Sequence, residues 1–166
     1  VRLAIGFAED TARSPEGGFL LDLLVRLAAR LYPTLSIRGS QARPQVASGL
    51  ERLAQSINPR VDIDSGEATV GIWVGRGAEV MAPRMFYAGS SGWDAKVSSI
   101  QPVTTGDSTN PFGAGASACL VMANVFRSVF CTPGPDLFDE DLVFPTLPGP
   151  AATEINELDL GETALV

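Results

Sequence analysis

The sequence predicts a three-layer α/β domain with a largely parallel sheet. Segments with the composition of strands and segments with the periodicity of helices alternate through the first 75 residues. The candidate strands are short and apolar, which is typical of buried strands. A strand-helix-strand-helix-strand order requires right-handed crossover connections, and these place helices against the faces of a parallel sheet.

The first strand and the helix after it are the most clearly defined elements. Residues 2–7, with the sequence RLAIGF, form a short apolar run. Ser14 can cap a helix, Pro15 suits its first position, and Glu16 complements the positive helix end. An apolar stripe follows at helical spacing and stops before the Tyr32-Pro33 pair. Its members are Leu20, Leu24, Leu27 and Leu31.

The other elements continue this alternation, less regularly after residue 78. We expect strands or short extended segments over 35–37, 61–63, 68–74, 85–88 and 96–100. We expect helices from Pro44 to the Asn58-Pro59 pair and from Asn110-Pro111 to about Phe130.

The third helix begins with six consecutive residues no larger than serine, Gly113 to Ala118. A glycine costs a helix interior up to about 1 kcal/mol relative to alanine, so its presence needs a compensating contact. We therefore expect this stretch to lie against another backbone, within the chain or in a second copy. The side chains that we expect in the core are Leu20, Leu24, Leu27, Leu31, Leu50, Leu53, Ile72, Val121, Val125 and Phe126.

Charge argues against nucleic acid as a partner. The net charge is −7, and Lys96 is the one lysine of the chain, whereas phosphate neutralisation needs a clustered basic surface. No uninterrupted apolar stretch approaches the length of a membrane span, and no signal peptide is recognisable. We expect a cytoplasmic protein without a membrane partner.

The residue types exclude several kinds of catalysis. The chain has no histidine, which rules out His-based acid/base chemistry and both Ser-His and Cys-His pairs. Two cysteines alone cannot form a four-cysteine zinc site. Cys119 falls in an apolar helical run, where we expect a buried, inert thiol. No catalytic residue and no metal ligand is assigned.

The first glycines do not predict a dinucleotide site. Gly6 lies at the end of the first strand, but Gly17 and Gly18 come about ten residues later and do not complete a G-x-G-x-x-G turn. The tight turn that brings backbone N–H groups to a pyrophosphate is replaced by a longer loop. An ordinary crossover connection is the favoured interpretation.

Two later segments are candidate anion- or ligand-binding sites. Asn110, Gly113 and Gly115 open the third helix, where unpaired N–H groups attract anions; helix capping and close packing are the alternative. Trp93 and Asp94 lie in a glycine-flanked turn and could present a ring and a carboxylate to a ligand. The alternative is that Trp93 covers the end of the sheet.

The chain divides into two parts. Residues 1–131 are expected to form the α/β domain, without a phosphate loop. Residues 132–166 form a Pro-rich acidic C-terminal extension, expected to be an extended linker leading into the first strand of a missing domain. That strand would start in the apolar run at the end of the chain, so we expect both chain ends to lie within a longer protein.

Two segments carry a resemblance to a known family. YAGSSGWDAKVS and GDSTNPFGAGASACLVMANVFRSVF resemble the region that precedes the nucleotide-binding domain in bacterial ThiF/HesA/MoeB-type, E1-like adenylyltransferases. The final residues, Glu162 to Val166, look like the first strand of that domain. The resemblance implies a degenerate Rossmann-like fold, and it places the ATP-binding glycines, arginine and metal-binding aspartate of the family outside this chain.

The resemblance implies a non-catalytic structural or partner-positioning half of an adenylyltransferase. Its partners would be the downstream adenylation domain or a second copy in a homodimer, and possible substrates include a small ubiquitin-like protein. ATP and Mg²⁺ are expected only in the missing domain, so this chain should bind ATP weakly or not at all. The alternatives are a free-standing small-ligand or nucleotide-binding domain and an enzyme that uses carboxylate and serine chemistry.

Overall fold

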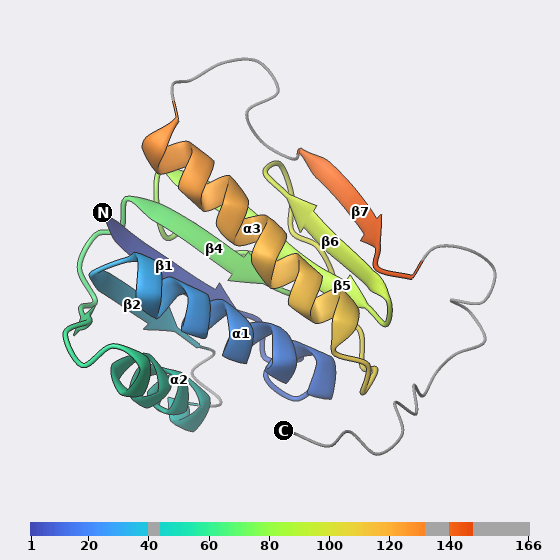
Figure 1. Cartoon of the computed structure of the whole chain (residues 1–166), viewed down its shortest axis with the longest axis horizontal. Coiled ribbons are helices and arrows are strands. Elements are labelled where there is room, and N and C mark those ends of the chain that lie inside the picture. Colours follow the sequence, from blue (N-terminus) through green and yellow to red (C-terminus); the bar gives the residue numbers. More distant parts are fainter. Residues whose placement is uncertain (40–43, 132–139, 148–166) are drawn as a thin grey trace, which may run out of the picture.

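The computed structural model describes residues 1–39, 44–131 and 140–147, and a seven-stranded sheet forms its centre. The strands are β1 (Arg2–Phe7), β2 (Thr34–Arg38), β3 (Asp62–Ile63), β4 (Val70–Val74), β5 (Arg84–Ser91), β6 (Asp94–Ser98) and β7 (Asp141–Pro145). They lie in the order β3-β2-β1-β4-β5-β6-β7 (Figure 1). β1 to β5 are parallel to one another, whereas β6 and β7 run antiparallel to their neighbours. This confirms the largely parallel sheet, and its first six strands have the Rossmann order.

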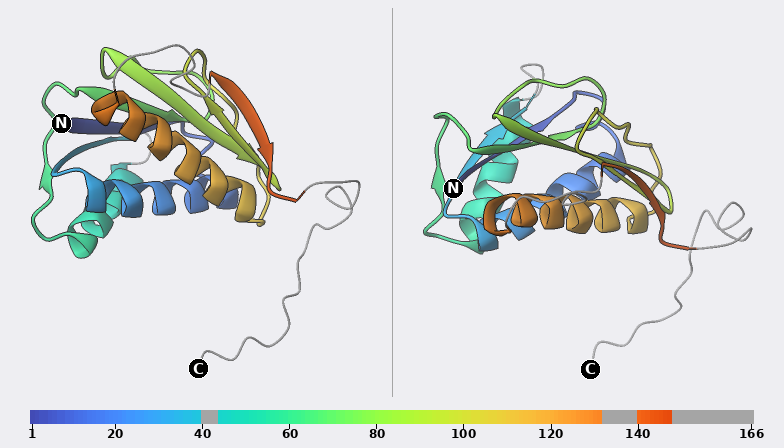
Figure 2. Two further views of the ribbon diagram at one scale, coloured as in Figure 1. Left: turned by 45° about the horizontal axis from the view of Figure 1, so that its top comes forward. Right: turned by 90° about the horizontal axis from the view of Figure 1, so that it is seen from above.

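Three helices cover one face of this sheet. They are α1 (Pro15–Leu31), α2 (Pro44–Ile57) and α3 (Phe112–Phe130), and Figure 2 shows all three on the same side. Leu3, Ile5 and Phe7 of β1 point toward them and belong to the cluster that contains the buried residues of the helices. The main core therefore lies between one sheet and one layer of helices.

The expected third layer is not formed by any described residue, because two connections on the opposite face lack helices. The connections from β3 to β4 and from β4 to β5 run across the sheet in the direction opposite to those from β1 to β3, so right-handed crossovers carry them over that face. Here they are the short segments 64–69 and 75–83. The second segment places Met81 against Ala4 and Trp73 in a small apolar cluster. A Cβ at Gly6 would lie 2.6 Å from the sulfur of Met81. Met81 can therefore pack on the strand at this point because residue 6 is glycine.

α1 begins as the sequence predicts and buries a slightly different stripe. The Ser14 hydroxyl accepts a hydrogen bond from the Gly17 N–H at 2.9 Å. Leu20 and Leu24 are fully buried, whereas Leu31 is 52% exposed. The face that packs on the sheet and on α3 is rotated from the expected stripe, so residues beside the leucines fill it. These are Leu21, Val25, Ala28 and Ala29.

The rest of the expected core is largely confirmed. Leu50, Ile72, Val121 and Val125 are buried, and Leu27 and Leu53 pack against the cluster while partly exposed. Phe126 was wrongly expected inside: it is 47% exposed and contacts the ring of Phe130 on the outer side of α3, with 4.7 Å between ring centroids. The helix period alone does not show which side of an apolar helix faces the sheet.

β7 falls in the segment that the sequence predicts to be a linker. It pairs with β6, so the expected boundary at residue 131 does not separate it from the sheet. The Ser99 N–H bonds to the Glu140 carbonyl and the Thr146 N–H to that of Trp93. In this antiparallel register the backbone groups of Asp141, Val143 and Pro145 point away from β6. The expected strand over 162–166 lies outside the described residues.

α3 is long and apolar enough to cross a membrane by length and composition, with 19 residues and a mean hydropathy of 1.3. It contains no uninterrupted apolar run of that length, because glycines, serines and Asn124 interrupt the helix. A core helix of a folded domain passes the same test. α3 has the contacts of such a helix, because it packs on β5 and β6 and beside α1.

Truncation of a core leucine tests this packing. Leu24→Ala should lower the free energy of unfolding by about 2–5 kcal/mol, because the side chain is fully enclosed. Leu31→Ala, on the same helix but half exposed, is the matched control and should cost under about 0.5 kcal/mol. Urea denaturation followed by circular dichroism measures both, and equal losses would contradict the described orientation of α1.

Candidate functional site

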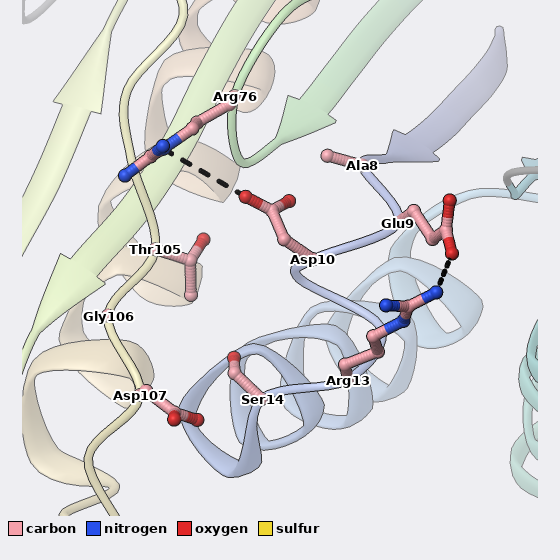
Figure 3. Close-up of a pocket in the computed structure, with 9 residues that line it drawn as sticks. All are labelled: Ala8, Glu9, Asp10, Arg13, Ser14, Arg76, Thr105, Gly106 and Asp107. Carbon is pink, nitrogen blue, oxygen red and sulfur yellow. Dashed lines mark hydrogen bonds and ion pairs between the residues drawn. The ribbon is translucent and has the colours of Figure 1, made fainter.

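A large pocket lies at the point in the sheet where the strand order reverses. The chain moves from β1 toward β2 on one side and from β4 toward β5 on the other, so a crevice opens at the carboxyl ends of β1 and β4. Ligands of open α/β sheets bind at such switch points. The pocket holds about 860 Å³ (Figure 3). Its lining residues are Ala8, Glu9, Asp10, Arg13, Ser14, Arg76, Thr105, Gly106 and Asp107.

The first wall is the loop between β1 and α1. Thr11 anchors it, because its buried hydroxyl donates to the Val74 carbonyl at 3.2 Å. Arg13 forms an ion pair with Glu9 along the exposed side of the loop. Asp10 accepts from the Thr11 N–H at 2.8 Å through one carboxylate oxygen, which leaves the other turned toward the pocket (Figure 3).

The second wall is the turn after β4, which presents Arg76. Gly75 and Gly77 flank this residue with φ values of +94° and +67°, in the region that favours glycine. The Trp73 indole N–H donates to the Arg76 carbonyl at 3.2 Å and so fixes the turn. The guanidinium Nε lies 3.9 Å from Asp10 Oδ2, and the Arg76 side chain is 75% exposed.

The third wall is the segment before α3. The Ser90 N–H donates to the Thr104 carbonyl at 3.2 Å and the Gly106 N–H to the Ser90 carbonyl at 2.8 Å. This segment therefore runs beside the end of β5, beyond the point where β4 stops. Thr105 Oγ1 is buried and has no hydrogen-bond partner among the described residues.

Glu16 holds the third wall to α1. Its side chain is fully buried. Oε1 accepts from the Gly92 N–H at 2.9 Å, and Oε2 accepts from the Ser108 N–H at 3.0 Å. A Cβ at Gly106 would lie 2.5 Å from Oε2, so this glycine allows the close approach. From the sequence, Glu16 is expected only to complement the positive end of the helix. Its hydrogen bonds to Gly92 and Ser108 could not be predicted, because both residues are distant in the chain.

The structure gathers the expected ligand residues at a different place, the joint between α3 and the β5–β6 hairpin. Asn110 Oδ1 accepts from the Phe112 N–H at 3.0 Å, and the Gly113 N–H donates to the Gly92 carbonyl at 3.1 Å. A Cβ at Gly113 would lie 2.7 Å from the Asp94 carbonyl oxygen. The small-residue helix thus lies against another backbone within the chain, as expected.

Trp93 covers this joint, where its ring stacks on Phe112 with 5.0 Å between centroids. Gly115 is less confined, because its nearest neighbour would be Leu23 Cδ2 at 3.7 Å from an added Cβ. Neither these residues nor Asn110, Gly113 and Asp94 line the pocket. Their ligand-binding role stays a prediction, and the switch-point pocket is the site that sequence reasoning missed.

The two cysteines are exposed, which corrects the expectation for Cys119. Cys119 follows the buried Ala118 on α3, and a step of one residue turns it about 100° toward solvent. Cys131 caps the end of the same helix. Neither thiol lines the pocket, and residues 1–39, 44–131 and 140–147 hold no cluster of three His, Cys, Asp or Glu suited to a metal.

A family model described as prokaryotic E2 family C matches residues 6–131. The chain therefore belongs to this family, which relates it to the ubiquitin-like E1/E2 conjugation system. The match gives no support for the adenylyltransferase family that the sequence resemblance implied.

The chain is also 44% identical over 131 residues to the uncharacterized protein y4jF of Sinorhizobium fredii (strain NBRC 101917 / NGR234). The aligned region covers 77% of this chain and 25% of that protein. The chain thus spans about a quarter of the length of this relative.

Two glycines of α3 should respond oppositely to alanine. Gly113→Ala should destabilise the domain by about 1–3 kcal/mol, because the new methyl group meets backbone atoms of the hairpin that cannot rotate away. Gly115→Ala has room and should stabilise it by up to about 1 kcal/mol through helix propensity. Thermal and urea unfolding measure both, and a destabilising Gly115→Ala would show closer packing there than described.

Neutralising Glu16 should loosen the third wall. Glu16→Gln places an amide N–H₂ against one of two backbone donors, which should cost about 1–3 kcal/mol. Hydrogen exchange should accelerate at the Gly92 and Ser108 amides before other sites. Glu79→Gln, at an exposed position, is the control, and unchanged protection of both amides in Glu16→Gln would contradict the described bonds.

Proposed function

We propose that this chain is a non-catalytic, partner-positioning domain of a protein in a ubiquitin-like conjugation system. Membership of prokaryotic E2 family C supports the system. The non-catalytic role is supported by the residues that line the switch-point pocket, the pocket at the carboxyl ends of β1 and β4. It is lined by carboxylates, guanidinium groups and hydroxyls, and no cysteine contributes to it.

Acyl transfer in a conjugation reaction needs an activated nucleophile. Ser14 lines the pocket, but its hydroxyl accepts from the Gly17 N–H as a helix cap and no base lies within the described hydrogen bonds. Arg13 and Arg76 cannot act as bases, because guanidinium groups stay protonated. Binding and orientation are what this arrangement supports best.

The parent protein supplies the remaining chemistry in this proposal. The relative from Sinorhizobium fredii is about four times longer than the aligned region. We propose that ATP and Mg²⁺ bind in a further, ThiF-like adenylating domain, and that this domain or a second copy packs beside the chain. Cytoplasmic residence belongs to the same proposal, as does a ubiquitin-like protein as the activated partner.

A second candidate function is a thioester carrier. Exposure of both thiols favours it, because Cys119 and Cys131 are open to solvent on α3. A carrier cysteine would attack an activated carboxyl group, expel its leaving group and hold the acyl chain as a thioester. The described surroundings of the two thiols include no histidine, since the chain has none.

A search for a thioester separates the two functions. The parent protein is purified from its host in acid without reductant, and intact masses are compared before and after dithiothreitol. We expect no thiol-labile adduct, and we expect the Cys119→Ser/Cys131→Ser double variant to support conjugation at the wild-type rate. An adduct that disappears in either single serine variant would establish the carrier. Unchanged conjugation after deletion of residues 1–131 would refute a positioning role.

A further inference from the structure

We infer that the outer face of α3 is a two-fold interface with a second copy of this chain, in which the two α3 helices pack antiparallel. This inference deepens the proposed function and rests on it for the kind of neighbour, because it selects the second copy over the adenylating domain. Three observations carry it: an exposed apolar repeat on α3, the complementarity of that repeat to its own reverse, and an exposed area that suits a dimer.

α3 carries a second apolar stripe, on the side away from the sheet. The side that packs on the sheet includes the buried Val121 and Val125. The outer stripe, here called the seam, has successive spacings of four, three, four, three and four residues, which is the heptad spacing of a coiled coil. None of its members is charged and none is buried. The seam consists of Phe112, Ala116, Cys119, Ala123, Phe126 and Phe130.

The seam is complementary to itself when one helix is reversed. An antiparallel pair of α3 helices centred on residue 121 brings each seam residue opposite another seam residue of the second copy. Each contact then occurs twice, as the two-fold axis of an isologous interface requires. The residues that face one another are Phe112 and Phe130, Ala116 and Phe126, and Cys119 and Ala123.

The reversed pairing also fits the sizes of the side chains. Phe126 meets Ala116, so a large side chain fills the space over a small one. Cys119 and Ala123 are small and lie at the centre of the seam, which lets the two helix axes approach closely. A parallel pair in register would instead place Phe126 against Phe126 and Ala116 against Ala116. Such a pair crowds one layer of the interface and leaves a gap in another.

The exposed phenylalanines supply much of the area that a stable interface needs. Phe112, Phe126 and Phe130 are 43%, 47% and 63% exposed. Phe19 of α1 is 42% exposed and lies one turn before Leu23, whose side chain borders α3. At roughly 200 Å² for each side chain, these four phenylalanines expose about 400 Å². Each partner of a standard interface buries about 800 Å², so they provide half of it.

The rings at both ends of the seam are held in place within one copy. Phe112 stacks on Trp93 with 5.0 Å between ring centroids. Phe126 contacts Phe130 with 4.7 Å between centroids. Side chains that are already fixed lose little conformational freedom when a partner covers them, so their burial favours association.

Charge does not oppose the pairing of two copies. Residues 1–131 hold all twelve basic residues and eleven of the nineteen acidic ones, which gives the domain a net charge of +1. The remaining eight acidic residues lie in the extension, 132–166. Arg127 is the one charged residue of α3 and lies beside the seam. In the reversed pair it faces Gly115 of the second copy and therefore meets no like charge on that helix.

Sedimentation equilibrium of the chain of residues 1–166 tests the inference. We expect a monomer–dimer equilibrium with a dissociation constant of about micromolar order. Cys119→Arg should weaken the dimer by at least about a hundredfold, because an unpaired guanidinium would be buried at the centre of the seam. Val80→Arg adds the same group at an exposed apolar position outside α3 and should associate as the parent does. Circular dichroism shows that each variant is folded.

Disulfide cross-linking tests the antiparallel register. The Cys131→Ser variant, which keeps Cys119, is mixed with the triple variant Cys119→Ser/Cys131→Ser/Ala123→Cys and oxidised. The two chains should join to each other, because residues 119 and 123 face one another in the reversed pair. Intact mass identifies the joined chains, and each variant oxidised alone should give far less product. Equally efficient cross-linking of Cys131→Ser alone would indicate a parallel pair and overturn the register.

A chain that remains monomeric at about 100 μM would overturn the inference, as would unchanged association in Cys119→Arg or an assembly larger than a dimer. A monomer that binds phosphatidylcholine vesicles would assign the face to a lipid surface instead, a use that the length and hydropathy of α3 also allow.

Association needs no conjugation chemistry, so its outcome is separable from that of the proposed function. A thioester on Cys131 would end the non-catalytic role and leave the dimer standing. A monomeric chain, in turn, would remove the second copy as a neighbour while the thioester search still decides the role of the domain.

Discussion

A single buried carboxylate organises the functional edge of this domain. Glu16 stands in the first turn of α1, and its two oxygens reach the β5–β6 hairpin and the segment before α3. Three segments that are distant in the sequence thereby share one acceptor group. A buried carboxylate is costly unless hydrogen bonds satisfy it, so these segments are fixed relative to one another. The position of the pocket's third wall depends on this arrangement.

The sheet has the Rossmann strand order although helices cover only one of its two faces. Two crossovers that could carry helices are short segments held by side chains. Arg2 bonds to the Glu67 carbonyl, and Arg38 bonds to the carbonyl oxygens of Ser65 and Gly66. Met81 fills the space over Gly6. Arginine hydrogen bonds and a methionine side chain thus hold the segments that stand in place of helices on this face.

The sequence predicts those features that depend on residues close to one another in the chain. The cap of α1 follows from Ser14 and Pro15, and the structure confirms it. The pocket depends on which strands end side by side, and no local pattern encodes this order. Gly113 and Gly115 stand in the same run of small residues, yet only the placement of the hairpin distinguishes them. The exposure of Cys119 likewise depends on which side of α3 faces the sheet.

The edges of the sheet limit how this domain can associate. On β7, Asp141 places a charge at the free edge, and Pro145 has no N–H to offer, so Asp141 and Val143 are the strand residues that present both a donor and an acceptor outward. The opposite edge, β3, has two residues. Neither described edge can template a strand of useful length. A neighbouring domain is therefore expected to meet this one through helices or loops, which leaves the carboxyl edge and its pocket open to a separate partner.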